Sequence, residues 1–474
     1  MTAVNDALVY GFTAREPLPP FLRPRGRRLI RLRIGEHREA GDFFAETERL
    51  RAMCGAAWNV RSYDLLNVMC TLRAADRYYR SAGLFENARE VRIAVTVADR
   101  RHWRALEDLF RRTVFTLSND RLQFEAIALA RKPPLARAAA LSSTDELRRV
   151  YRPDCVCLFS GGADSFSGAA YLLSIGRRPL LIGHAVGPIS GRQQELFEAL
   201  RERFPELPPQ ALIQTRSYPC SPRRGEPRPD WMWRQRDDLQ RLRSMYFLSL
   251  AALIGAGHGL EEFFLCENGL IGAAIVWAPN QDTPYTTRPA EPHYLRQMQS
   301  FLSSALDRTL QIRNPFQYLT KGEVLRGTAE LGLTRTLYRT VSCWRSGNRG
   351  IRNCGQCVPC MFRQLAFDEA GLADPQADGY AHPIPRTRWA DWDSPARHRL
   401  FALRDYAARI ASPRGRTRLL AEEPAVTDAI DVTGGPADVV RVNSEAQQAL
   451  DDAAPELMAG TIERFARHIA TRLA

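Results

Sequence analysis

The sequence predicts an α/β protein whose central part is a doubly wound, mainly parallel sheet. Three short apolar runs, at 155–159, 179–185 and 261–268, have the length of buried strands. Helical patterns lie between them, and such alternation is typical of parallel sheets. A Gly- and Ser-rich turn directly follows the first run, at the end of the strand where ligands bind in these sheets.

Three regions are expected along the chain. Residues 1–150 mix strand-like and helical patterns, which predicts an N-terminal α+β accessory domain with no catalytic constellation. A Pro- and Ala-rich connector at 131–143 marks its end. Residues 151–368 contain the doubly wound domain, and residues 369–474 predict a mostly helical C-terminal region.

Composition indicates a globular, cytoplasmic protein that does not enter a membrane. No apolar run approaches the roughly 20 residues of a membrane span, and the N-terminus has no export signal. The net charge of +13 is almost all arginine, interleaved with acidic residues, so we favour solvated helix faces over a nucleic-acid surface. Lysine occurs only at Lys132 and Lys321, and a lysine kept in such a chain indicates a need for a compact ammonium.

The turn after the first run has the composition of a phosphate-binding loop. Its glycines let the backbone approach a ligand, and the helix that follows presents its positive N-terminal end. Asp164 would repel a phosphate, which suggests Mg²⁺ between the two, although an ordinary turn in which Asp164 caps the helix is the alternative. The segment consists of Ser160, Gly161, Gly162, Ala163, Asp164 and Ser165.

A strand, then SGGxDS, then a helix resembles the PP-loop ATP pyrophosphatases, which have a HUP-like fold. The resemblance implies cleavage of ATP between its α- and β-phosphates and adenylation of a substrate oxygen. Residues 160–165 would then bind the pyrophosphate part of ATP.

Four of the ten cysteines form a cluster with ten, two and two residues between them: Cys343, Cys354, Cys357 and Cys360. Four thiolates at such spacing predict a closed, structural Zn²⁺ site. An Fe–S cluster, as in some PP-loop RNA thiolases, is the competing interpretation. The other six cysteines are expected to be small buried hydrophobes.

The phosphate turn together with the segment from Ser342 to Arg363 resembles the QueC family of 7-cyano-7-deazaguanine synthases. Two further stretches fit, RSMYFLSLAA with Arg243 and NPFQYLTKGEV with Lys321, so the resemblance covers about 154–368. It implies a ligase that uses ATP, Mg²⁺ and structural Zn²⁺. Such an enzyme adenylates 7-carboxy-7-deazaguanine, forms the amide with ammonia, and uses a second ATP to make the nitrile. Asp164, Lys321 and Arg243 are the catalytic candidates.

The expected base pocket departs from the family pattern, which leaves the substrate and the ammonia step open. Its candidates are Asn268, Gly269, Thr287, His293 and Arg296.

The chain is about twice as long as such synthases need, and long QueC-like proteins resemble the QueC-like subunit of the Qat anti-phage system. This implies partner proteins of a defence operon, an oligomer or complex, and transfer of the activated acid to a protein amine as an alternative to ammonia. A PP-loop RNA-modifying enzyme and a non-catalytic ATP-binding subunit are the other hypotheses.

Overall fold

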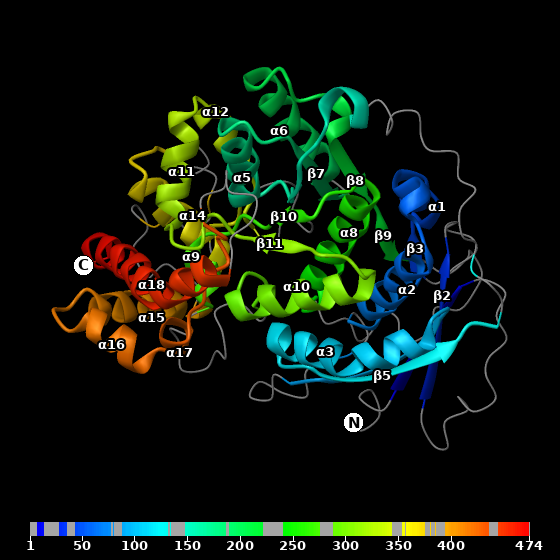
Figure 1. Ribbon diagram of the computed structural model, residues 1–474. Coiled ribbons are helices and arrows are strands. Elements are labelled where there is room, and N and C mark those ends of the chain that lie inside the picture. Colours follow the sequence, from blue (N-terminus) through cyan, green and yellow to red (C-terminus); the bar gives the residue numbers. More distant parts are fainter. Residues whose placement is uncertain are drawn as a thin grey trace.

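The fold combines two mainly parallel sheets with a helical C-terminal region (Figure 1). The structure is a computed structural model. Within the part of the chain that it describes, no helix is long and apolar enough to span a membrane. The described residues are 7–13, 28–35, 43–76, 79, 88–130, 133, 147–185, 189–220, 240–274, 288–343, 353–355, 357–374, 380, 384, 394–435 and 444–473.

The first sheet has the strand order β5-β4-β1-β2-β3-β9, and every pair is parallel except β3 with β9. The α+β expectation for this region is refined by that pairing. Between β4 and β5 a helical crossover, α3, makes the pair parallel. Its strands are β1 (Ala7–Thr13), β2 (Arg28–Gly35), β3 (Phe43–Ala45), β4 (Glu90–Val97), β5 (Arg121–Ala128) and β9 (Ser217–Pro219). The last of these comes from beyond the connector, so residues on both sides of it build one sheet.

The second sheet is doubly wound, as expected, with the order β11-β10-β6-β7-β8 and parallel pairing throughout. The chain starts in the middle at β6, adds β7 and β8 on one side, and then returns to add β10 and β11 on the other. The strands are β6 (Cys155–Leu158), β7 (Pro179–His184), β8 (Leu212–Thr215), β10 (Glu262–Phe264) and β11 (Gln311–Arg313). The topological switch point therefore lies between β6 and β10.

One hydrophobic core joins the two sheets. Helices α2 and α8 pack against each other and against strands of both sheets, and α3 packs against α10 beside them. Almost every residue of α2 is buried, as expected for a helix enclosed on all sides. The helices of these two layers are α1 (Thr47–Cys54), α2 (Val60–Ala75), α3 (Arg100–Ser118), α5 (Ala163–Ser174), α6 (Ile189–Arg203), α8 (Arg243–Gly257), α9 (Gly269–Ala273), α10 (Pro292–Leu306), α11 (Lys321–Glu330) and α12 (Thr334–Leu337).

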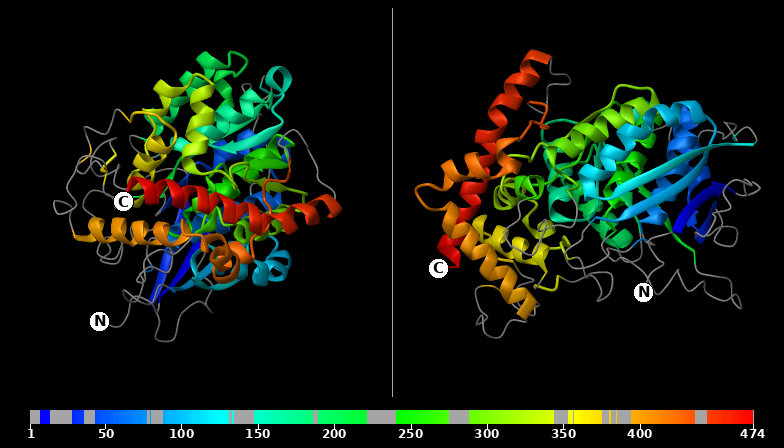
Figure 2. Two further views of the ribbon diagram at one scale, coloured as in Figure 1. Left: turned by 90° about the vertical axis from the view of Figure 1, so that its left-hand side faces the viewer. Right: turned by 90° about the horizontal axis from the view of Figure 1, so that it is seen from below.

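The C-terminal region is helical, as expected, and has its own hydrophobic core. This core also takes in apolar residues of α9 and α14, so the region is packed onto the second layer. The long helix α18 is in contact with α15, and the left view of Figure 2 shows the two side by side. The helices are α14 (Val358–Glu369), α15 (Ser394–Ile410), α16 (Gly415–Glu422), α17 (Pro424–Thr427) and α18 (Ser444–Arg472).

Candidate active site and metal centre

The Gly- and Ser-rich segment forms a tight turn between β6 and α5. Gly161 has φ +86°, a left-handed conformation that favours glycine. The Ser160 and Ser165 hydroxyls lie 2.9 Å apart, and the Gly162 amide donates to the Ser160 Oγ (3.3 Å). The two hydroxyls thus stabilise the turn by hydrogen bonds within it. No side chain caps the first N–H groups of α5. Those N–H groups are free to receive an anion.

Asp164, at the start of α5, is the centre of a buried polar cluster. Its Oδ2 forms an ion pair with Lys321 Nζ, and its Oδ1 accepts a hydrogen bond from Asn268 Nδ2 at 3.1 Å. All three residues are buried. Lys321 begins α11 and Asn268 follows β10, so the cluster joins three segments that are distant in sequence at the switch point of the second sheet.

Lys321 is oriented by the way in which α11 begins. Thr320 and Glu323 form a reciprocal capping box, in which the Thr320 Oγ1 accepts from the Glu323 amide (3.1 Å) and the Glu323 Oε2 accepts from the Thr320 amide (2.8 Å). This fixes the first turn of the helix and with it the backbone of Lys321. Lys321, which the scarcity of lysine singled out in the sequence, thus lies beside Asp164.

Glu267 is a member of the site that the sequence analysis missed. Its backbone is held on both sides by Asn314, which accepts from the Glu267 amide (3.1 Å) and donates to its carbonyl (2.8 Å). Burial and, next, the negative charge of Asp164 raise the pKa of Glu267 to about 8, against the opposing effect of Lys321. In the sequence, only its position directly before Asn268, shortly after a strand, points to the site, and that position by itself does not distinguish a site residue.

Arg243 lies on the other side of the switch point, near the end of β7. It begins α8, and its guanidinium carbon is 5.9 Å from the centre of the Phe247 ring. That ring lies 4.8 Å from the imidazole of His184, the last residue of β7. The described contacts of Arg243 do not include Asp164 or Lys321.

The expected base-pocket residues separate into two groups. Asn268 belongs to the cluster around Asp164, and Gly269 follows it with its amide bonded to the Leu319 carbonyl (2.9 Å). His293 and Arg296, on α10, instead bond residues of the C-terminal region. His293 Nε2 lies 2.6 Å from the carbonyl of Asp428, and Arg296 binds both carboxylate oxygens of Asp451 (2.7 and 2.8 Å). Thr287 lies outside the described residues.

The four clustered cysteines come together and could hold a metal such as zinc. Their sulfur atoms all lie within 4.8 Å of one another, with Cys354–Cys360 at 3.9 Å and Cys357–Cys343 at 4.0 Å. A tetrahedral Zn²⁺ with bonds of about 2.3 Å separates its sulfur ligands by about 3.8 Å. The donor set and its geometry therefore fit Zn²⁺, and the site is closed by four protein ligands, which is typical of a structural metal.

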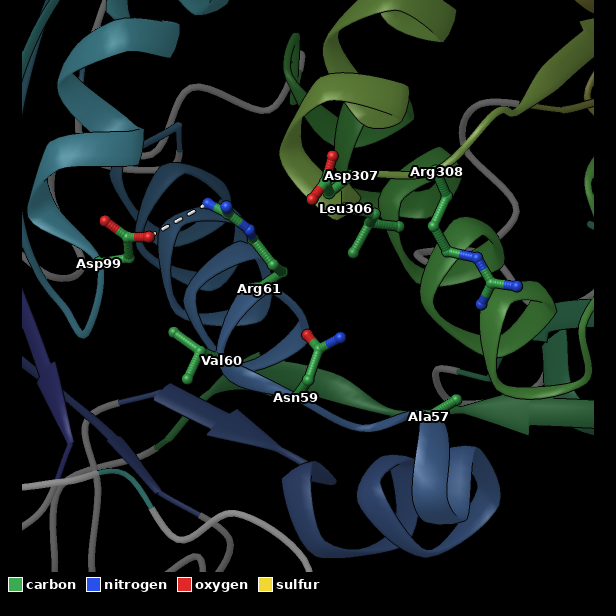
Figure 3. Close-up of a pocket in the computed structure, with 8 residues that line it drawn as sticks. All are labelled: Ala57, Asn59, Val60, Arg61, Asp99, Leu306, Asp307 and Arg308. Atoms are coloured by element: carbon green, nitrogen blue, oxygen red, sulfur yellow. Dashed lines mark hydrogen bonds and ion pairs between the residues drawn. The ribbon is translucent and has the colours of Figure 1, made fainter.

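A hollow of about 660 Å³ lies at a different place, between the two sheet layers. It is lined by the start of α2 and by the turn after α10, which precedes β11 and so belongs to the amino edge of the second sheet. Figure 3 shows Arg61 directed toward Asp99, with which it pairs at 3.3 Å, while Arg308 points away from that pair. Charges of both signs line this hollow, and the phosphate turn lies at the opposite, carboxyl edge.

Comparisons with known proteins find sequence similarity to 7-cyano-7-deazaguanine synthases. Residues 271–371 match the family model described as queuosine biosynthesis protein QueC. The 7-cyano-7-deazaguanine synthase of Thermoplasma acidophilum is 27% identical over 239 residues, which are 47% of this chain and 91% of that protein. The synthase of Desulfitobacterium hafniense is 32% identical over 112 residues, 22% of this chain, and that of Stutzerimonas stutzeri 42% over 65 residues, 14% of this chain. The chain spans 46% and 28% of the lengths of these last two relatives.

Proposed function

We propose that this chain, which carries a QueC-type domain, is an ATP-dependent enzyme that adenylates a 7-deazaguanine carboxylate. The observation that carries the proposal is the buried cluster of Asp164, Lys321 and Asn268 beside a phosphate turn, at the switch point of a doubly wound sheet. A small-molecule site is expected at that point. The similarity to 7-cyano-7-deazaguanine synthases supports the choice of acid.

The first step of the proposed reaction forms the acyl adenylate. A carboxylate oxygen of the substrate attacks the α-phosphorus of ATP, the bond between the α-phosphorus and the bridging oxygen breaks, and pyrophosphate leaves. The free N–H groups at the start of α5 and the ammonium of Lys321 stabilise the charge that develops on the leaving group. Asp164 would hold Mg²⁺, which offsets further phosphate charge when bound.

The second step transfers the acyl group to an amine. The amine attacks the carbonyl carbon, one proton leaves the nitrogen, and the C–O bond to AMP breaks to give an amide. We assign the acceptance of that proton to Glu267, because its raised pKa brings a carboxyl group into the range of a general base near neutral pH. With ammonia as the amine, the amide oxygen would attack the α-phosphorus of a second ATP with release of pyrophosphate, and loss of AMP and the two amide protons would give the nitrile.

A protein amine is the second candidate acceptor. The observation that favours it is the additional structure around the QueC-type domain: a six-stranded sheet and a C-terminal helical core, in a chain of which 47% matches 91% of a synthase. Layers added around a catalytic domain suit partner binding, as in a complex of an anti-phage defence operon. Transfer to a partner would then replace nitrile formation.

The proposal is tested by exchange of labelled pyrophosphate into ATP with 7-carboxy-7-deazaguanine and Mg²⁺, followed by product mass with and without ammonium. Acid-dependent exchange that is lost in Asp164→Asn and kept in Asp108→Asn, an exposed matched control, is the expected result. Amide or nitrile identifies ammonia as the acceptor, and AMP release only with a partner protein identifies a protein amine. No exchange with the acid would overturn the proposal. Exchange only with RNA would point to RNA modification, and bound but unreacted ATP to a non-catalytic subunit.

A further inference from the structure

We infer that the C-terminal helix α18 positions the catalytic lysine. Arg464 and Thr461 of this helix bind the segment 318–323, which begins α11 and carries Lys321. Only the activity measurement that tests this inference rests on the proposed function. The family match ends at residue 371, so α18 is a part of this chain that the matched domain does not include.

Arg464 binds the residue that caps the helix of Lys321. Its Nε donates to Glu323 Oε1 at 2.7 Å and its Nη2 to Glu323 Oε2 at 3.2 Å, a bidentate pair. Glu323 Oε2 also accepts from the Thr320 amide within the capping box. The guanidinium thus fixes the carboxylate that fixes the first turn of α11.

The same two residues of α18 hold the chain just before that turn. The carbonyl of Tyr318 accepts from Thr461 Oγ1 at 2.7 Å and from Arg464 Nη2 at 2.9 Å. A backbone carbonyl has two lone pairs, so both are used. Helix α18 therefore fixes the backbone that leads into Lys321.

Close packing extends this contact to the segment of Asn268. A Cβ added to Gly269 would lie 2.2 Å from the Gln317 carbonyl oxygen and 3.1 Å from Thr461 Cγ2. Only glycine therefore allows the start of α9 to lie against both the lysine segment and α18. Asn268, one residue earlier, bonds Asp164, so the helix contacts two of the three segments that form the site.

Farther along, α18 is anchored on α14, the helix that carries Cys360 and directly follows Cys357. The Phe465 and Phe362 rings stack with centres 5.4 Å apart. Near the end of α18, Arg472 Nε pairs with Asp368 at 3.1 Å. These two contacts fix the position of α18 along α14. Arg464 therefore reaches Glu323 from a fixed position.

The ion pair between Arg464 and Glu323 orients the start of α11 and contributes little to the folding free energy. Arg464 is 47% and Glu323 23% exposed, and an ion pair that accessible contributes little to the folding free energy because solvent screens it. Loss of the pair should therefore disturb the position of Lys321 without unfolding the protein. Effects on the lysine and on global stability can be measured separately.

The two lysines of the chain make a direct test possible. Selective ¹³C labelling of the lysine ε-carbon gives two signals, which Lys132→Arg assigns. We expect Arg464→Met to move the Lys321 signal and to leave the Lys132 signal in place. Arg467→Met is the matched control, because Arg467 lies on the same helix and pairs only with Glu463 among the ion pairs of the described chain. An unmoved Lys321 signal in folded Arg464→Met would overturn the inference.

Pyrophosphate exchange supplies the second test. We expect Arg464→Met to lower kcat about tenfold with a change in the KM for ATP below threefold, because the ATP-binding turn is untouched while Lys321 is displaced. Thr461→Val, which removes one bond to Tyr318, should have a smaller effect in the same direction. Equal kcat in Arg464→Met and Arg467→Met would contradict the inference. If the wild-type protein shows no exchange, the proposed function fails, and the lysine signals still decide the role of α18.

Discussion

Val341 donates its backbone N–H to the carbonyl of Gly161 at 3.3 Å. Val341 lies two residues before Cys343 and packs against the cysteine cluster, while Gly161 is the left-handed residue of the phosphate turn. The cysteine cluster and the Gly- and Ser-rich turn are therefore in direct backbone contact, although 180 positions separate the two residues. A structural metal at the cysteines would fix one wall of the turn.

Removal of the metal should weaken nucleotide binding. We expect chelation, or Cys360→Ser, to lower the affinity for ATP at least tenfold and to lower the melting temperature, because the segment that holds Gly161 loses its anchor. Calorimetric titration with a non-hydrolysable ATP analogue, with metal content measured in parallel, checks this. Restored affinity after zinc is added back is the control for chelation. Unchanged affinity in metal-free protein would show that the turn stands without the cysteine site.

Acid should destabilise the protein through His258. Both ring nitrogens are buried without a hydrogen-bond partner, and burial lowers the pKa of His258 to about 4. A pKa lower in the folded than in the unfolded protein gives stability that is present above pH 6.5 and lost as the pH falls toward 4, because the unfolded state takes up the proton first. We expect a loss of about 2 kcal/mol between pH 7.5 and 5 from this residue.

Urea denaturation across this pH range measures the effect of His258. The variant His258→Phe should lack this part of the pH dependence, whereas His398→Phe, at an exposed position, should keep it. Parallel curves for wild type and His258→Phe would contradict the assignment.

The local patterns of the site were predictable from the sequence, and its long-range contacts were not. The phosphate turn and the cysteine spacing are short motifs whose chemistry follows from a few neighbouring residues. Glu267 escaped notice because a single acidic residue after a strand has no distinctive pattern. Its pKa is raised first by burial and next by the charge of Asp164, which is far away in sequence. Its role appears only when the sheet brings these residues together.

In the fold, too, the local features were predictable from the sequence and the long-range contacts were not. Alternating strands and helices predicted the doubly wound sheet, because that periodicity is local. The contribution of β9 to the first sheet depends on a three-residue strand that pairs with β3 across more than 170 positions, which no local signal reveals. Likewise, His293 and Arg296 resembled pocket residues by their place in the sequence, but their partners lie in the C-terminal region.

Glu267→Gln should slow amine transfer and spare adenylation. Only the ionised carboxylate accepts a proton, so wild-type transfer should rise with pH around a pKa near 8, while the glutamine variant should be about 100-fold slower and insensitive to pH. Hydroxylamine is the suitable nucleophile, because it stays unprotonated above pH 7 and its own titration does not shape the profile. Glu202→Gln, at an exposed position, is the control. The same pH profile in Glu267→Gln and wild type would remove Glu267 from the mechanism.

Asp164 and Lys321 should prove strongly coupled in stability as well as in activity. Both side chains are less than 10% exposed, so removal of one partner leaves a buried charge uncompensated, which costs about 3–5 kcal/mol. We expect Asp164→Asn and Lys321→Met each to destabilise by about that amount. The double variant should be more stable than the sum of the single losses predicts by at least about 2 kcal/mol, because neither charge remains. Urea denaturation of the four proteins gives the coupling energy. All three variants should lose pyrophosphate exchange at least 100-fold, which separates the pair's catalytic role from its structural one: additive stabilities together with retained exchange would show that the two side chains neither pair in solution nor act on ATP.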